Sequence, residues 1–148
     1  MKIAIGADHG GYQLKESIKK YLDEKNITYH DFGTHSEDSV DYALMAAPVA
    51  HAVANGEYDL GLLFCGTGIG MSMAANKVKG IRAACCSDYF SAKYTRMHND
   101  ANILCMGGRV VGMGLAQELV DVFLNTPFEG GRHERRINQI KQIEDGII

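Results

Sequence analysis

The sequence predicts an α/β fold, a three-layer sandwich with helices on both faces of a mostly parallel sheet. Short apolar runs alternate with amphipathic helical patterns along the chain, which is the pattern of repeated βαβ units. Glycine-rich and polar segments directly follow several apolar runs, where α/β proteins carry their functional loops. The length of 148 residues fits one domain with a sizeable core. We therefore expect a single domain over residues 1–148.

The first predicted unit is a strand at Lys2–Ala7 followed by a helix. In that helix apolar side chains share one face, and charged side chains, among them Lys15 and Lys19, take the other. A second strand is predicted at Thr28–Phe32, followed by a polar turn. An alanine-rich helix from about Asp41 to Asn55 then precedes a third, strongly apolar strand.

The alternation continues through the second half of the chain. It predicts helices and strands in turn at Met71–Lys77, Arg82–Cys86, Tyr89–Met97, Ile103–Met106 and Met113–Leu124. The last segment, Arg132–Ile147, follows a break that contains proline and glycine, and its isoleucines recur among charges at helical spacing. A helix at the end of a chain often contacts another copy, so we expect this one to reach a partner subunit.

Composition excludes several classes of protein. A formal net charge of -3 and a sequence pI near 6.0 indicate no basic surface for nucleic acid. No stretch has the length and apolarity of a membrane span or the pattern of a signal peptide, so we expect a cytoplasmic protein without a membrane partner. The 4 cysteines are expected to be reduced thiols. Their spacing relative to the histidines is not that of a zinc site, and no metal is expected.

The segment that follows the third strand carries the strongest chemical signal. The apolar run Leu60–Phe64 delivers Cys65 into a turn in which glycine recurs at every second position. Such a turn can point several backbone N–H groups at one anion. A thiolate there could remove a proton from carbon while the amides hold the resulting enolate oxygen. The alternative, a cysteine that is only a small buried hydrophobic residue, describes the other three cysteines better.

Two further loops follow predicted strands and hold polar side chains. Asp8 and His9 follow the first strand, and Arg109 follows the fifth. Because the carboxyl ends of parallel strands meet at one edge of a sheet, we expect these loops to converge with Cys65. Taken singly, Asp8 could simply cap the first helix and His9 could be a solvated loop residue.

Polar residues also gather before the fifth strand and in the last helix. His98 and Asn99 end a predicted helix, where a histidine could be only a C-terminal helix cation and the asparagine a turn residue. Arg132 and Arg136 stand four residues apart, so they share a helical face that can bind a phosphate group. A solvated basic face is the alternative.

Four segments in register carry a family resemblance: Ile-Gly-Ala-Asp-His-Gly-Gly, Cys-Gly-Thr-Gly-Ile-Gly, His-Asn-Asp-Ala-Asn and Gly-Gly-Arg-His-Glu-Arg-Arg. The chain resembles the B-type ribose-5-phosphate isomerases essentially from end to end. The resemblance implies a Rossmann-like fold with a five-stranded parallel sheet, and a homodimer, sometimes paired into a tetramer, with active sites built from both chains. It also implies cofactor-free, metal-free interconversion of ribose 5-phosphate and ribulose 5-phosphate in the pentose phosphate pathway.

The resemblance further implies roles for single residues. Cys65 matches the base that moves a proton between C2 and C1 of the sugar through an enediolate, and His98 matches the residue that opens the furanose ring. Thr67 completes the catalytic set. The positions that match substrate contacts, with the arginines matching the phosphate-binding group, are Asp8, His9, Gly66, Thr67, Gly68, Ile69, Gly70, Asn99, Arg109, Arg132 and Arg136. One branch of the family uses a glutamate where this chain has Met71, which leaves Cys65 as the base of this loop.

Other functions fit parts of the pattern. Glycines at alternate positions after a strand, with Asp88 near the end of the next strand, suggest a nucleotide or S-adenosylmethionine binder. Their spacing differs from G-x-G-x-x-G, and they follow the third strand rather than the first. A non-catalytic sugar-phosphate sensor would use the arginines but would leave the cysteine and histidine without a task. Within the family, allose 6-phosphate and galactose 6-phosphate are alternative substrates.

Overall fold

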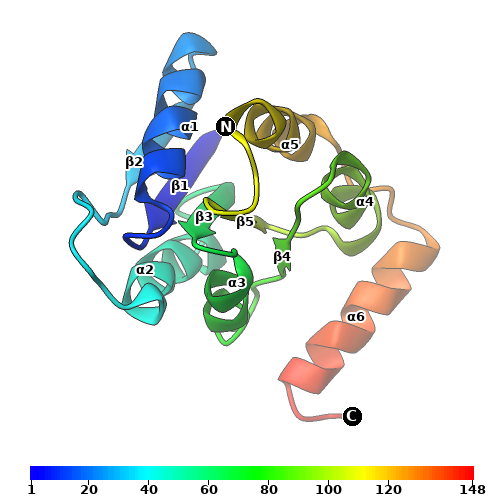
Figure 1. Cartoon of the computed structure of the whole chain (residues 1–148). Helices are drawn as coiled ribbons and strands as arrows, with labels where there is room; N and C mark the ends of the chain where they lie inside the picture. Colours follow the sequence, from blue (N-terminus) through cyan, green and yellow to red (C-terminus); the bar gives the residue numbers. More distant parts are fainter.

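The computed structural model describes residues 1–148 and contains one sheet of five parallel strands with helices on both faces (Figure 1). The strands are β1 (Lys2–Ala7), β2 (Thr28–Asp31), β3 (Leu60–Cys65), β4 (Ala83–Cys85) and β5 (Ile103–Gly107), in the spatial order β2-β1-β3-β5-β4. The helices are α1 (Tyr12–Glu24), α2 (Tyr42–Ala54), α3 (Ile69–Ala75), α4 (Tyr89–Asn99), α5 (Met113–Asn125) and α6 (Arg132–Glu144). The predicted fold class is therefore confirmed.

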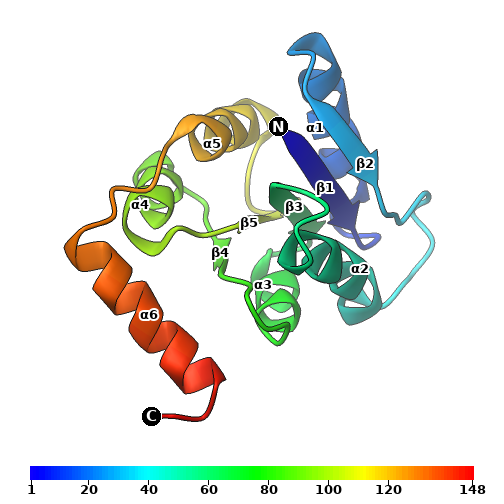
Figure 2. The ribbon, with the colours of Figure 1, turned by 180° about the vertical axis from the view of Figure 1, so that it is seen from behind.

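Two hydrophobic cores lie on the two faces of the sheet. Helices α1 and α5 pack with α4 on one face, and α2 and α3 cover the other (Figure 2). Successive side chains of a strand point to opposite faces. Leu62 and Phe64 of β3 therefore join the first core, whereas Leu63 and Cys65 join the second. Every residue of β3 is buried, as expected for a strand that is covered on both faces.

Helix α6 extends beyond the sheet and packs beside α4 (Figure 1). The carboxylate of Glu144 accepts a hydrogen bond from the N–H of Gly80 at 2.9 Å, which ties the end of α6 to the segment before β4. Ile140 and Ile143 of this helix remain 47% and 63% exposed. The helix thus presents an apolar face that the chain itself does not cover. None of the helices has the length and apolar character needed to cross a lipid bilayer.

Several predicted boundaries and one predicted face were wrong. Helix α3 begins at Ile69 rather than Met71, because Gly68 adopts φ +82° and caps it. Helix α4 continues through Asn99, so Asn99 is helical and not a turn residue. Lys15, predicted on the charged outer face of α1, is completely buried, because Asp31 at the end of β2 pairs with it.

Candidate active site

Three loops meet at the carboxyl edge of the sheet, as predicted. Backbone hydrogen bonds join them directly: the N–H of Asp8 donates to the carbonyl of Phe64 at 3.1 Å, and the N–H of Gly108 donates to that of Cys65 at 2.8 Å. The N–H of Arg109 donates to the carbonyl of Gly66 at 3.1 Å. Residues that follow β1, β3 and β5 therefore form one continuous backbone surface.

Glycine makes this convergence possible. A Cβ atom on Gly11 would lie 2.3 Å from the carbonyl carbon of Phe64. A Cβ atom on Gly107 would lie 2.7 Å from the carbonyl oxygen of Gly66. Side-chain atoms cannot approach backbone that closely, so the glycines let the loops pack in direct contact.

Asp8 organises the first loop. Its carboxylate oxygen Oδ1 accepts hydrogen bonds from the N–H groups of Gly10 at 2.8 Å and Gly11 at 3.1 Å. Helix α1 has Gly11 as its N-cap and receives no side-chain cap, so Asp8 stabilises the turn before the helix rather than capping the helix. The buried carboxylate is consequently fixed beside the loop that carries Cys65.

Cys65 ends β3, is 5% exposed, and receives a hydrogen bond. The N–H of Gly68 donates to its Sγ at 3.0 Å. This contact holds the sulfur against the backbone of the glycine loop. A residue larger than glycine at position 68 would meet both the left-handed backbone and the carbonyl carbon of Met106, 2.8 Å from an ideal Cβ.

Some backbone N–H groups of the glycine loop form hydrogen bonds within the chain, and others have no partner. The N–H of Ile69 donates to Oγ1 of Thr67 at 3.2 Å, and that of Gly68 serves the sulfur. The N–H groups of Gly66, Thr67 and Gly70 have no hydrogen-bond partner within the chain. These three open donors, rather than every amide of the predicted cradle, are available to an anion.

Arg109 lies against the same loop. Its Nη1 would be 3.2 Å from a Cβ placed on Gly66. The arginine side chain therefore packs over Gly66, and a larger residue at position 66 would crowd it. The arginine is exposed, and its guanidinium can bind a phosphate group with two parallel hydrogen bonds. A positively charged guanidinium therefore lies beside the glycine loop.

His9 is oriented by the connection between β2 and α2. Its Nδ1 accepts a hydrogen bond from the N–H of Val40 at 3.2 Å. Because a neutral imidazole carries one donor and one acceptor nitrogen, Nε2 is left as the donor. The side chain can thus donate to an oxygen of a bound sugar.

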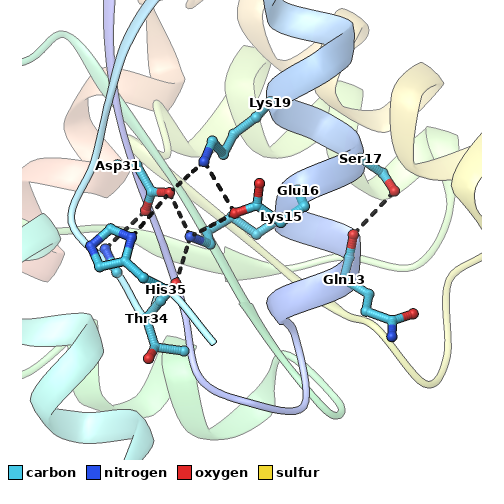
Figure 3. A network of polar contacts seen from close by, with 9 residues as sticks. Gln13, Lys15, Glu16, Ser17, Lys19, Asp31, Thr34 and His35 are labelled. Atoms are coloured by element: carbon cyan, nitrogen blue, oxygen red, sulfur yellow. Dashed lines mark hydrogen bonds and ion pairs between the residues drawn. The ribbon is translucent and has the colours of Figure 1, made fainter. Parts of the chain in front are cut away.

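A buried ionic network supports that connection (Figure 3). Asp31 Oδ2 accepts from Nζ of Lys15 at 2.6 Å and from Nζ of Lys19 at 2.8 Å. Lys15 also donates to the carbonyl of Thr34 at 2.7 Å, which holds the first residues of the connection. Burial alone would raise the pKa of Asp31, but hydrogen bonds from Lys15 and Lys19 outweigh burial and lower it.

Two other side chains frame the glycine loop. The ring of Tyr42 would lie 3.0 Å from a Cβ on Gly70, so it covers the loop at the start of α2. Met71, the position of the alternative base, is completely buried in the core of the α2–α3 face.

His98 and Asn99 lie at the opposite edge of the sheet from Cys65. Helix α4 ends at Asn99 and leads into the start of β5, whereas Cys65 lies at the end of β3. The parallel strands are about 15 Å long at 3.3 Å per residue, which separates the two edges. His98 and Asn99 line a hollow of about 370 Å³ together with Cys86, Phe90 and Tyr94. Within one chain, His98 and Cys65 therefore do not lie in the same site.

The two arginines of α6 belong to the His98 side of the molecule. Arg132 and Arg136 are both exposed, and between them His133 is buried and stacks on His98 with ring centroids 4.0 Å apart. The predicted residues thus form two groups. The carboxyl-edge group comprises Asp8, His9, Cys65, Gly66, Thr67, Gly68, Ile69, Gly70 and Arg109, and the α4–α6 group comprises His98, Asn99, Arg132 and Arg136.

A parallel sheet with a thiol and an arginine at one glycine-rich edge characterises an α/β enzyme that acts on a small anionic substrate. A family model described as Ribose/Galactose Isomerase matches residues 3–140. The chain belongs to this family, which confirms the resemblance in the sequence.

Individual relatives agree with this assignment. The chain is 50% identical to the ribose-5-phosphate isomerase B of Escherichia coli strain K12, covering 97% of this chain and 96% of that protein. It is 41% identical to the D-erythrulose-4-phosphate isomerase of Pectobacterium atrosepticum, covering 97% and 95%. The solved ribose-5-phosphate isomerase B of Clostridium thermocellum superposes with a TM-score of 0.98 at 51% identity, covering 100% of both chains.

Asp88, the acidic residue that the nucleotide-binding alternative requires, has a structural role instead. The side chain of Asp88 caps α4 by accepting a hydrogen bond from the N–H of Ser91 at 2.7 Å. That hydrogen bond lowers the pKa of Asp88. Because this carboxylate stabilises the helix, it does not serve as a free ligand for ribose hydroxyls.

Proposed function

We propose that the protein interconverts ribose 5-phosphate and ribulose 5-phosphate, with Cys65 as the base. The observation that carries the proposal is the contact between Cys65 Sγ and the N–H of Gly68 at 3.0 Å, beside the open N–H groups of Gly66 and Gly70. This arrangement combines a sulfur oriented by a backbone donor with further donors for the oxygen that becomes negative. Both are required because a proton next to a carbonyl group is far less acidic than a thiol.

The proton transfer can be followed atom by atom. The thiolate removes the proton from C2 of the open-chain aldose, and the electron pair moves through C1 onto O1. Open amides of the loop stabilise that charge, a contribution of roughly 3 to 4 kcal/mol for one donor in measured cases. A second proton passes from O2 to O1, and the thiol returns its proton to C1. The exposed hydroxyl of Thr67 lies in the same loop and is proposed to hydrogen-bond the enediolate.

Binding energy away from the reacting carbons positions the sugar. Arg109, Arg132 and Arg136 are proposed to hold the phosphate, whereas Asp8, His9 and Asn99 contact the hydroxyl groups. The N–H of His9 Nε2 suits a sugar oxygen because Nδ1 is already occupied by Val40. A remote anchor of this kind places C2 against the sulfur and lowers the entropic cost of the reaction.

A complete site requires a second copy of the chain. His98 and Cys65 lie at opposite edges of the sheet, so we propose a homodimer in which His98, Asn99 and the arginines of α6 reach the partner's Cys65 loop. The exposed isoleucines of α6 support such a contact. Dimers can pair further into a tetramer. Four free thiols support the predicted cytoplasmic location.

Isotope exchange tests the proposed base. The protein is incubated with ribose 5-phosphate in deuterated water, and product formation and label at C1 and C2 are followed by NMR. We expect Cys65→Ala to lose both isomerisation and exchange, because no other base lies in the loop. Cys105→Ala, which removes a thiol that is completely buried in β5, should behave as the parent. Equal turnover by Cys65→Ala and the parent would remove the proposed base.

Mixing two inactive variants tests the shared site. In a mixed dimer of Cys65→Ala and His98→Ala chains, one of the two sites regains both side chains while the other loses both. Random exchange of subunits should therefore restore about a quarter of the parent activity towards ribose 5-phosphate, since half the dimers are mixed and each carries one intact site. No restoration after verified exchange would indicate that each chain builds its own site.

A different phosphorylated sugar is the second candidate substrate. The relative that acts on erythrulose 4-phosphate shares 41% of its residues with this chain, so the family scaffold accommodates a shorter sugar. Turnover of erythrose 4-phosphate, allose 6-phosphate and galactose 6-phosphate should be compared with that of ribose 5-phosphate. A higher kcat/KM for one of them would replace the proposed substrate and leave the proposed base unchanged.

A further inference from the structure

The ring-opening candidate His98 belongs to a compact group of three side chains, which we call the histidine cluster: His98, Glu129 and His133. The two imidazole rings stack with centroids 4.0 Å apart and an angle of 9° between their planes. Glu129 Oε2 lies 3.8 Å from Nε2 of His98 and 3.3 Å from Nε2 of His133. The ring of Tyr94 meets His98 edge-on at 5.0 Å. His98 is therefore held between an aromatic edge and a flat imidazole, with a carboxylate at its Nε2.

The backbone builds this cluster from two distant segments. The N–H of Glu129 donates to the carbonyl of Met97 at 3.0 Å, which fixes the connection before α6 against the last turn of α4. The N–H of His133 donates to the carbonyl of Gly130 at 3.1 Å. His133 is only 5% exposed, yet its Nε2 has no hydrogen-bond partner. The nearest acceptor to this nitrogen is the carboxylate of Glu129 at 3.3 Å, so His133 and His98 face the same acidic group.

The cluster has the residue types of a zinc site, but its geometry does not suit a cation. Ligand nitrogens donate in the plane of their rings, and two rings that stack in parallel direct these lone pairs side by side rather than at one point. Arg132 and Arg136 add positive charge beside His133. We therefore assign no metal to these residues.

We infer that Glu129 and His133 are positioning residues for His98 during opening of the sugar ring. This inference rests on the proposed role of His98. Ring opening breaks the bond between C1 and O4, forms a double bond between C1 and O1, and moves a proton from O1 to O4. His98 accepts the first proton and delivers it to O4, so the ring is transiently an imidazolium. The carboxylate of Glu129 stabilises that cation, and the stacked ring of His133 fixes its plane.

The titratable and charged side chains around His98 come from three parts of the chain. Tyr94 comes from α4, Glu129 from the connection between α5 and α6, and Arg132, His133 and Arg136 from α6. Burial lowers the pKa of His133, and His98, Arg132 and Arg136 act in the same direction while Glu129 opposes them. The surroundings of His133 thus disfavour a second charged imidazole beside His98.

Two reactions separate ring opening from proton transfer at carbon. Ribulose 5-phosphate has no furanose form, because its O5 carries the phosphate, so exchange of its C1 hydrogen with deuterated water needs the base but no ring opening. Turnover of ribose 5-phosphate needs both. We expect Glu129→Gln and His133→Phe to retain the exchange rate within about twofold and to lower turnover of ribose 5-phosphate about tenfold or more, at the low end of acid–base contributions.

The pH dependence gives a readout that a structural role would not move. Removing the carboxylate withdraws support from the cationic form of His98, so Glu129→Gln should shift the acid limb of the turnover profile to lower pH. Glu134→Gln is the matched control, since Glu134 is an exposed acid in the first turn of α6. Glu129 is itself 42% exposed at the side chain, so its glutamine variant should fold even if His133→Phe does not.

His98→Ala distinguishes failure of the inference from failure of the proposed function. If His98→Ala turns over ribose 5-phosphate at the parent rate, His98 does not open the ring. If His98→Ala is slow but Glu129→Gln has the rate and pH profile of Glu134→Gln, His98 keeps its role and the positioning role is overturned. Equal losses of exchange and turnover in Glu129→Gln would also overturn it, because the residue would then serve the whole site.

Discussion

Replacing Asp31 by asparagine should destabilise the protein far more than its place near the surface suggests. Lys15 is completely buried, and its ammonium group has Asp31 at 2.6 Å as its closest acidic partner. Removing one partner of a buried pair costs about 3 to 5 kcal/mol, because the remaining charge is left uncompensated. Glu16 at 3.5 Å and the carbonyl of Thr34 at 2.7 Å still face Lys15. We therefore expect the lower end, about 3 kcal/mol, for Asp31→Asn.

Removing the other partner of the pair, Lys15, should lower the free energy of unfolding by less than removing Asp31. In Lys15→Met the carboxylate of Asp31 retains Lys19 at 2.8 Å and the N–H of Gly33 at 2.9 Å. Its side chain also keeps 11% exposure to water. The methionine fills the buried volume of the lysine stem, so we expect a loss of about 1 to 2 kcal/mol.

Urea unfolding followed by tyrosine fluorescence and circular dichroism measures both values, since the chain has 7 tyrosines and no tryptophan. Protein concentration must be held constant, because assembly contributes to apparent stability. Glu16→Gln is the matched control, with a side chain that is 33% exposed and an expected cost of about 0 to 1 kcal/mol. A loss for Asp31→Asn no larger than that of the control, or no larger than that of Lys15→Met, would refute the reasoning.

Three other predictions follow from single contacts. Folding lowers the pKa of Asp31. The resulting stability is present above the unfolded pKa of about 3.9 and is lost as pH falls through the lower folded value. Urea unfolding from pH 6 to pH 3 should therefore show a steeper loss of stability for the parent than for Asp31→Asn. Gly11→Ala should unfold or misplace the first loop, since its Cβ would lie 2.3 Å from Phe64, whereas Gly112→Ala, with open space around it, should melt within a few degrees of the parent. Gly66→Ala would crowd Nη1 of Arg109 at 3.2 Å and should raise KM several-fold with less effect on kcat; an unchanged KM would argue against a phosphate contact by Arg109.

The sequence was most informative where a local pattern has one physical explanation. Apolar runs that alternate with helical periods favour a mostly parallel sheet covered on both faces, and the loops after parallel strands then meet at one edge. The sequence could not tell which amides of the glycine loop remain open, because that depends on the positive φ of Gly68 and on the direction of the Cys65 side chain. Both are set by packing against β5, which is distant in the sequence.

One predicted helix face and the division of the site into two groups depended on topology rather than on periodicity. Lys15 occupies a polar position of its helix, but its partner Asp31 comes from a neighbouring strand, so helical periodicity alone placed it in solvent. His98 stands near Arg109 in the sequence, yet it precedes β5 while Arg109 follows it. A residue before a parallel strand lies at the opposite edge from a residue after it, and the order of elements alone could have separated the two groups.

The exposure of Cys65 bears most directly on how the proposed site works. Cys65 is 5% exposed and lines none of the cavities of the single chain, so a second surface over its loop would be needed to enclose a sugar there. The rim of its loop is apolar and open, with Tyr42, Ile69 and Met73 each about half exposed or more. Exposed apolar rims mark interaction surfaces. A partner that covered this rim would exclude water from the thiolate and, by bringing His98, would join ring opening to proton transfer in one enclosed volume.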